Sequence, residues 1–226
     1  SYPPYDPNAF IVGGEAAANI LLDSRNPLVN YAIGSRDTPG SIFKMVTATA
    51  GLLNGQLTLS ERISDGGRFD KYDKTNPPRC WLNPKRLSQH ADQTVVEGIT
   101  HSCNYFFYEM GYRLSGLSGT AVNNERGLKK LEKYADKYGL TDLSGVELTE
   151  AQPHVSDSDA VRSAIGQGTN SYTPVQLSRY VSTISNGGTC YDLTLVDKVA
   201  DSSQNNKIKN NKAKVRNELD IKSSTL

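Results

Sequence analysis

The stretch that decides the fold runs over residues 38–53 and reads Thr-Pro-Gly-Ser-Ile-Phe-Lys-Met-Val-Thr-Ala-Thr-Ala-Gly-Leu-Leu. From Ser41 to Leu53, apolar side chains fall on nearly every side of a helix. This pattern is typical of a buried helix, because a surface helix shows a single apolar stripe. Pro39-Gly40 precedes the helix, and Asn54-Gly55 supplies a left-handed stop. The sequence therefore predicts a buried helix that begins at Ser41.

Further predicted elements lie on either side of this helix. Terminal residues and helical periodicity predict four more helices, the last opened by an N-cap and a proline at Thr173-Pro174. They cover residues 94–100, 104–114, 125–138 and 174–184. Residues 62–82 read as a β-hairpin, whereas residues 1–14 and the polar residues 201–214 read as loops. The chain is thus expected to be rich in helix, with few strands.

Composition excludes several classes of protein. The 226 residues hold 25 Lys plus Arg against 24 Asp plus Glu, and a net charge of +1 gives no global field to hold nucleic acid or anionic lipid. Hydrophobic residues make up 37% of the chain, which is enough for a core. No apolar run approaches the roughly 18 residues of a membrane helix. The first six residues lack signal-peptide features, and three cysteines are too few for a disulfide scaffold.

Ser41 and Lys44 form a candidate nucleophile and base. At a spacing of three, both side chains lie on one face of the predicted helix, so the amine can reach the hydroxyl. A serine needs an adjacent base, and a lysine serves as one only when desolvation lowers its pKa. Lys44 stands among apolar neighbours, which provide that desolvation. At the helix N-terminus, the backbone N–H of Ser41 is placed to stabilise an oxyanion. Taken alone, Ser-x-x-Lys is a common tetrapeptide.

A second candidate element is Ser102-Cys103-Asn104, between two predicted helices. Its serine would relay a proton between Lys44 and a leaving group, and its amide would hold a substrate carbonyl. A lone Ser-x-Asn is more often a helix cap. Ser-x-x-Lys, Ser-Asp-Asn and Lys-Thr-Gly, however, occur together in penicillin-binding proteins and class A β-lactamases.

With these motifs, several stretches resemble the class B penicillin-binding proteins in the order of that family. Residues 38–44 are similar to its nucleophile motif, and residues 101–104 to its second motif. Residues 1–8 resemble the loop after the family's first strands. Ala164-Ile165-Gly166-Gln167-Gly168, with residues 173–177 and 184–188, resembles the segment before its third motif. The matches extend to about residue 190 of the chain.

The resemblance implies an α+β fold, of which this chain holds the helix-rich part of a penicillin-binding protein/β-lactamase-like transpeptidase domain. Most strands of the central sheet are expected outside the chain. The expected division of residues 1–226 is an N-terminal loop to residue 40, a nucleophile helix with a helical subdomain over 41–190, and a polar connecting segment over 191–226.

The resemblance also implies a serine D,D-transpeptidase that cross-links peptidoglycan stem peptides through an acyl-enzyme and is a target of β-lactams. In that scheme Ser41 is the nucleophile and Lys44 the general base. Ser102 is the proton relay and Asn104 the substrate-amide contact. Gly166, Gln167 and Gly168 are predicted to bind substrate. No cofactor is required. Stem peptides and β-lactams are the expected partners, without nucleic acid.

One departure from the family pattern leaves two interpretations open. No Lys-Thr-Gly or Lys-Ser-Gly follows Asn104, and Lys222-Ser223-Ser224 has serine where glycine is needed. The first interpretation is a fragment of an enzyme on the extracytoplasmic face of the bacterial membrane, with any anchor outside this chain. The second is a non-catalytic β-lactam-binding sensor or scaffold. Hydrolysis of β-lactams would need a further base, for which Glu147 and Glu150 are the nearest candidates.

A metal site is a separate hypothesis. Asp65, Cys80, His90 and Cys103 offer the carboxylate, thiolate and imidazole ligands that zinc prefers. If the hairpin returned Cys80 beside Asp65, the four residues would join it to the Ser102 loop. Their spacing matches no common zinc-finger pattern. Two buried free thiols with a surface histidine, or a Cys80–Cys103 disulfide, remain as alternatives.

Overall fold

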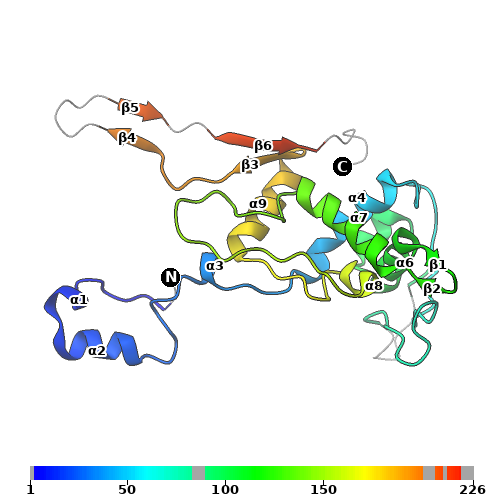
Figure 1. Cartoon of the computed structure of the whole chain (residues 1–226), viewed down its shortest axis with the longest axis horizontal. Coiled ribbons are helices and arrows are strands. Elements are labelled where there is room, and N and C mark those ends of the chain that lie inside the picture. Colours follow the sequence, from blue (N-terminus) through cyan, green and yellow to red (C-terminus); the bar gives the residue numbers. More distant parts are fainter. Residues whose placement is uncertain (1–2, 83–89, 201–206, 211–212, 220–226) are drawn as a thin grey trace.

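The computed structural model describes residues 3–82, 90–200, 207–210 and 213–219, and helices dominate these residues (Figure 1). The helices are α1 (Ala9–Val12), α2 (Gly14–Leu22), α3 (Tyr31–Gly34), the 3₁₀ turn η1 (Gly40–Phe43), α4 (Lys44–Leu53), α5 (Val95–Thr100), α6 (Asn104–Ser115), α7 (Asn124–Lys137), α8 (Ala160–Ser163) and α9 (Pro174–Ser185). The strands are β1 (Leu117–Ser118), β2 (Ala121–Val122), β3 (Thr189–Asp192), β4 (Lys198–Ala200), β5 (Lys207–Asn210) and β6 (Lys214–Glu218).

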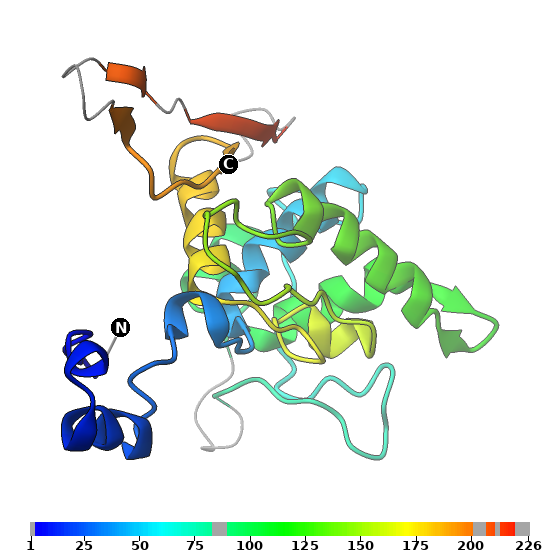
Figure 2. The ribbon, with the colours of Figure 1, turned by 60° about the vertical axis from the view of Figure 1, so that its left-hand side comes forward.

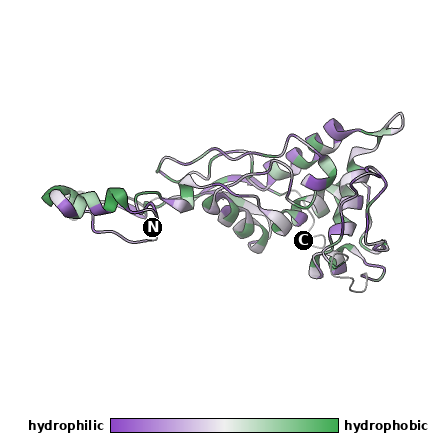
Figure 3. Ribbon diagram, turned by 90° about the horizontal axis from the view of Figure 1, so that it is seen from below, coloured by the Kyte–Doolittle hydropathy of each residue, from purple (hydrophilic) through white to green (hydrophobic). Residues whose placement is uncertain are grey.

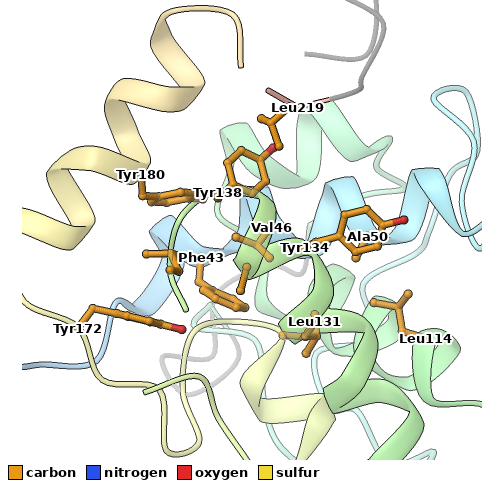
Figure 4. Packing of buried hydrophobic residues seen from close by; sticks show 13 residues of the cluster. Phe43, Val46, Ala50, Leu114, Leu131, Tyr134, Tyr138, Tyr172, Tyr180 and Leu219 are labelled. Carbon is orange, nitrogen blue, oxygen red and sulfur yellow. The ribbon is translucent and has the colours of Figure 1, made fainter. Parts of the chain in front are cut away.

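The helix α4 lies at the centre of the body and packs against both α6 and α7. Its residues divide between two hydrophobic clusters. Phe43, Val46 and Ala50 pack with Leu131, Tyr134, Tyr138 and Tyr180 (Figure 4). Ala48 belongs to the second cluster, which includes aromatic residues of α6. Two cores on different sides of one helix explain why its sequence is apolar nearly all round, as predicted for a buried helix.

The four other predicted helices are confirmed with bounds that differ by at most one residue at each end. Helices α5 and α9 each begin with a capping box, in which Thr94 and Thr173 accept from the backbone N–H three residues on, while Glu97 and Gln176 reach back. On α7 the predicted stripe buries Leu131, Tyr134, Ala135 and Tyr138.

Among the described residues the strands form three two-stranded antiparallel sheets, β1–β2, β3–β6 and β4–β5. The β3–β6 and β4–β5 ribbons follow one another along one edge of the molecule (Figure 1). Helix α9 leads into β3 and packs against it. The predicted helix-rich α+β character is thus confirmed.

Three predicted loop or strand assignments differ from the structure. Residues 62–82 form no ladder but an irregular loop closed by a single bridge between Arg68 and Arg79, because the Gly66-Gly67 and Pro77-Pro78 pairs interrupt strand pairing. Residues 1–40, predicted as a loop, contain α1, α2 and α3. The polar tail contains β4, β5 and β6, whose backbone pairing needs no apolar face.

The N-terminal helices α1 and α2 stand apart from the body of the molecule (Figures 1 and 2). Neither has a buried residue. Together α1 and α2 (residues 9–22) form an N-terminal arm, and Figure 3 shows hydrophobic segments along it. Several large apolar side chains of the arm are exposed to solvent. They are Phe10, Ile11, Val12, Leu21 and Leu22. Within the described part of the chain, no helix combines the length and apolar character of a membrane span.

Candidate active site

Ser41 lies in the 3₁₀ turn η1 that leads into α4, and its side chain is exposed. Gly40, just before it, has φ of +57°, a conformation that glycine adopts readily. The turn leaves Ser41 and Ile42 exposed, whereas the two residues after them enter the core. Phe43 is 1% exposed and Lys44 only 2%.

Ser102 occupies the left-handed position that ends α5. Its N–H donates to the Ile99 carbonyl at 3.0 Å, and the Cys103 N–H donates to the Gly98 carbonyl at 2.9 Å. These two bonds define a Schellman motif, in which the left-handed residue is usually glycine. Ser102 has φ of +50° and therefore carries backbone strain that a glycine would avoid. This strained turn aims the Ser102 hydroxyl at Ser41.

Lys44 links the two motifs through its ammonium group. Its Nζ donates to the Ser102 carbonyl at 2.8 Å, to Ser102 Oγ at 3.0 Å and to Asn104 Oδ1 at 2.7 Å. Asn104, the first residue of α6, thus presents its amide oxygen to the amine. Nζ also lies 5.5 Å from the centroid of the Phe107 ring. The amine is buried, and its three hydrogen-bond acceptors belong to Ser102 and Asn104.

Ser102 Oγ forms the bridge between nucleophile and amine. It donates to Ser41 Oγ at 2.9 Å and accepts from Lys44 Nζ at 3.0 Å. The sequence places Lys44 in reach of Ser41 directly, whereas in the structure Ser102 stands between them. The three groups form a continuous chain along which protons can pass. The predicted members Ser41, Lys44, Ser102 and Asn104 are therefore brought together.

Burial lowers the pKa of Lys44 to about 8, against the smaller opposite effect of Cys103 and Cys80. Desolvation disfavours the charged amine, whose pKa is ordinarily near 10.5. A pKa of about 8 leaves roughly one molecule in ten with a neutral amine at pH 7. That fraction is sufficient for Lys44 to act as a base, and its pKa is close to the working range.

The predicted substrate-binding residues lie behind the nucleophile turn. The Gly166 carbonyl accepts from the Gly40 N–H at 3.2 Å, and the Gln167 carbonyl accepts from the Asn170 amide at 2.8 Å. Gly168 lies beside the hydroxyls of two buried serines, Ser156 and Ser163. Of these contacts, the one between Gly166 and Gly40 reaches the peptide before Ser41.

The sequence reasoning missed a further contact on the same turn. The buried hydroxyl of Tyr180 donates to the Ile42 carbonyl at 2.7 Å. The only sequence signal was an aromatic residue on α9, which a core position explains equally well. Glu150, considered as a hydrolytic base, is instead buried and accepts from Ser144 and Thr173.

The four predicted metal ligands converge beside the Ser102 turn, with their ligand atoms all within 4.8 Å of one another. Cys80 Sγ lies 3.9 Å from Cys103 Sγ and 3.4 Å from His90 Nδ1. Asp65 Oδ2 lies 2.8 Å from His90 Nδ1 and 3.5 Å from Cys103 Sγ. For tetrahedral zinc with Zn–S of about 2.3 Å and Zn–N of about 2.0 Å, ligand atoms lie roughly 3.3–3.8 Å apart. Two of the four distances, 3.4 and 3.5 Å, fall within that range, 3.9 Å lies just above it and 2.8 Å is a hydrogen-bond distance.

Charge at this cluster suits a cation. The hydrogen bond from Cys103 lowers the pKa of the Cys80 thiol to about 6, and the same interaction raises the pKa of Cys103. Asp65 is almost fully buried, with His90 in contact with its carboxylate. Zinc binds thiolate, neutral imidazole and carboxylate, so these four groups fit its donor preferences.

An exposed serine, a desolvated lysine and a second serine hydrogen-bonded to both are the groups that nucleophilic acyl transfer requires. Comparison with known proteins gives the family. The model for the penicillin binding protein transpeptidase domain matches residues 1–226, and this chain belongs to that family. The resemblance to class B penicillin-binding proteins is thereby confirmed.

Relatives and solved structures agree with this assignment. The peptidoglycan D,D-transpeptidase MrdA of Escherichia coli is 25% identical over 205 residues, covering 83% of this chain and 30% of that protein. Stage V sporulation protein D of Bacillus subtilis is 31% identical over 175 residues, covering 72% and 23%. Penicillin-binding protein A of M. tuberculosis, solved as an imipenem acyl-enzyme, has a TM-score of 0.81 at 23% identity, covering 100% and 50%. The chain spans about 30% of the length of the first of these relatives.

Proposed function

We propose that the protein is a serine D,D-transpeptidase that cross-links peptidoglycan stem peptides. The observation that carries this proposal is the Ser41–Ser102–Lys44 chain of hydrogen bonds, with an amine whose pKa burial lowers to about 8. The E. coli relative is named a peptidoglycan D,D-transpeptidase, which is the same activity. An extracytoplasmic location at the bacterial membrane belongs to this proposal, because peptidoglycan is assembled there.

In the acylation step Ser41 Oγ attacks the carbonyl of the penultimate D-Ala. As the O–C bond forms, the Ser41 proton passes to Ser102 Oγ while the Ser102 proton passes to the neutral Lys44 amine. The C–N bond then breaks, and Lys44 returns a proton through Ser102 to the departing D-Ala amine. An amine of a second stem peptide attacks the resulting ester and reverses these proton transfers. Asn104, held by Lys44, orients the substrate amide.

A β-lactam follows the first half of this sequence. Its strained amide opens on Ser41, and the amine released by the ring stays tethered to the adduct, so it cannot depart as D-Ala does. The solved relative that carries imipenem as an acyl-enzyme supports this behaviour for the family's fold.

The test uses a fluorescent penicillin and intact mass measurement on the full-length protein. We expect a single adduct on the wild type and none on Ser41→Ala. Ser118→Ala, an exposed serine in β1, is the matched control and should label like the wild type. Absence of an adduct on the wild type would remove the proposal.

The alternative is a non-catalytic β-lactam sensor, which would be favoured only if the whole protein, like the residues after Asn104 here, lacked Lys-Thr-Gly and Lys-Ser-Gly. Both functions predict labelling of Ser41, so turnover separates them. An enzyme releases D-alanine from a stem peptide that ends in D-Ala-D-Ala. A sensor is acylated by the penicillin but releases no D-alanine from the stem peptide.

We also propose that Asp65, Cys80, His90 and Cys103 bind a structural zinc ion. Bound there, zinc would join the 62–82 loop to the turn that carries Ser102, because Cys103 directly follows it. Metal analysis of the purified protein should find about one zinc per chain, and Cys80→Ser should lose it. Cys190→Ser is the control, since Cys190 is equally buried but lies outside the cluster. A wild type that holds no zinc contradicts this proposal.

A further inference from the structure

The nucleophile turn over residues 37–43 is held by a segment more than one hundred residues later in the chain. Asp37 and Tyr172 exchange two backbone hydrogen bonds, each 3.0 Å long. At the other end of the turn, the Tyr180 hydroxyl donates to the Ile42 carbonyl at 2.7 Å. Ser41 lies between these two anchors, and neither belongs to its own helix.

Gly166 contacts the residue directly before Ser41. Its carbonyl accepts from the Gly40 N–H at 3.2 Å. A Cβ atom at Gly166 would lie 2.8 Å from the Gly40 carbonyl carbon and 2.9 Å from the Gly40 nitrogen, and nearer still to its oxygen. Because these atoms are backbone, no flexible side chain can yield. Any side chain at residue 166 would therefore push on the peptide that leads directly into Ser41.

We infer that Gly166 and Tyr180 are positioning residues for the nucleophile, acting through Gly40 and Ile42 to keep Ser41 Oγ within hydrogen-bond distance of Ser102 Oγ. This inference rests on the proposed acylation of Ser41. It gives Gly166 a role different from the substrate contact that its sequence context suggests. The physical basis is that the Ser41–Ser102 bond, 2.9 Å long, joins two separate motifs. A displacement of about 1 Å at a reacting group can cost about 10²-fold in rate.

Two other glycines provide matched controls for Gly166→Ala. Gly145 has φ of +99°, and a Cβ there would lie 3.0 Å from the backbone nitrogen of Leu193, which lies outside the nucleophile turn. Gly187 has φ of +84° with open space around it. Alanine at any of the three adds the strain of a positive φ, but only at Gly166 does it press on the nucleophile turn.

Tyr180→Phe has its own matched control. Tyr138 also has a buried hydroxyl, which lies 2.8 Å from Thr49 Oγ1 on the same helix α4 but outside the nucleophile turn. Tyr138→Phe therefore removes a comparable buried hydrogen bond without releasing Ile42. Tyr180→Phe keeps the aromatic ring, so it also tests the inference if Gly166→Ala does not fold.

The experiment measures, on the full-length protein, the first-order acylation rate constant, the dissociation constant of the noncovalent penicillin complex and the free energy of unfolding. We expect Gly166→Ala to lower the acylation rate constant about 10²-fold. We expect about tenfold for Tyr180→Phe, the equivalent of one net hydrogen bond. The dissociation constant should change by less than about threefold in both, since the substrate contacts remain. Gly145→Ala, Gly187→Ala and Tyr138→Phe should acylate nearly as the wild type.

Two results would overturn the inference. In one, the acylation rate constants of Gly166→Ala and Tyr180→Phe match those of their controls. In the other, rate loss follows the loss of unfolding free energy across all five variants, which indicates a merely structural role. An unlabelled wild type would instead defeat the proposed transpeptidase function, so the two failures are distinguishable.

Discussion

At the scale of single residues, the site depends on two unfavourable placements. Lys44 is an amine taken out of water, and Ser102 is a non-glycine residue in a left-handed conformation. Each costs stability and each serves the proposed chemistry, because desolvation lowers the pKa of Lys44 so that a part of it is neutral and can accept a proton, and the strained turn aims the Ser102 hydroxyl at Ser41. Such local conflicts between stability and function are expected at catalytic sites.

The strain at Ser102 predicts opposite effects on stability and activity. Ser102→Gly should exceed Ser102→Ala in unfolding free energy by about 1 kcal/mol, because glycine accepts φ of +50° without a Cβ penalty. Both variants lose the relay hydroxyl, so their acylation rates should be at least about 10²-fold lower than that of the wild type. Urea unfolding and penicillin labelling measure the two quantities. A Gly variant that labels at the wild-type rate would show that Ser102 relays no proton.

The lowered pKa of Lys44 predicts the pH dependence of acylation. Lys44 accepts a proton only when neutral, and its pKa is about 8. Below that pH the acylation rate should fall about tenfold per pH unit, and above it the rate should level off. Lys44→Arg should remain slow at every pH, because a guanidinium does not deprotonate in this range. A flat wild-type profile between pH 6 and about pH 9 would assign the base to another group.

At the scale of elements, nearby residues in the sequence determine where a helix begins. How much a capping residue contributes to the free energy of unfolding depends on how deeply it is buried. Thr94 and Thr173 cap α5 and α9 by the same capping box, yet Thr173 is fully buried. Its hydroxyl also donates to the buried carboxylate of Glu150 at 3.1 Å. We therefore expect the capping box to stabilise the protein more at α9, the helix that carries Tyr180, than at α5.

This difference predicts unequal losses from the same substitution. Thr94→Ala should lower the free energy of unfolding by about 1 kcal/mol, the ordinary effect of a lost cap. Thr173→Ala should lower it by about 2–3 kcal/mol, because a buried acceptor also loses its donor. Denaturant unfolding of the two variants tests the comparison, and equal losses would contradict the role assigned to burial.

At the scale of the whole molecule, some apolar residues are buried in the core and others are exposed to solvent. Phe43, 1% exposed, packs into the core around α4, whereas Ile11 and Val12 on the N-terminal arm are 84% and 83% exposed. Of these three residues, only Phe43 stabilises the fold of this chain by removing apolar surface from water. Hydrophobic sequence alone does not distinguish them.

The contrast predicts how stability responds to mutation. Phe43→Ala should lower the free energy of unfolding of this chain by about 3–5 kcal/mol through lost burial and a cavity. Ile11→Ser and Val12→Ser should change it by less than about 0.5 kcal/mol. Thermal or urea unfolding of the 226-residue chain is the measurement. A large loss from either serine variant would place the arm in the cooperative core.

The features that depend on near neighbours in the chain were predictable from the sequence. The buried helix after Ser41, the caps of α5 and α9 and the apolar stripe of α7 all follow from helical periodicity and terminal residues. The motifs at Ser41 and Ser102 were recognised through their resemblance to a family. The irregular 62–82 loop, the arm helices and the tail strands were not predicted correctly, since short elements carry weak local signals.

What the sequence determined by itself, then, is which side chains are available and which helices present them. The tertiary structure decided how they connect: that Ser102 stands between Ser41 and Lys44, and that Gly166 and Tyr180 hold the nucleophile turn. It also decided that Cys80 and Cys103 meet beside Asp65. These contacts join residues tens to more than one hundred positions apart. Local propensity does not reach that far, and only the packing of the helices around α4 brings them within a few ångströms.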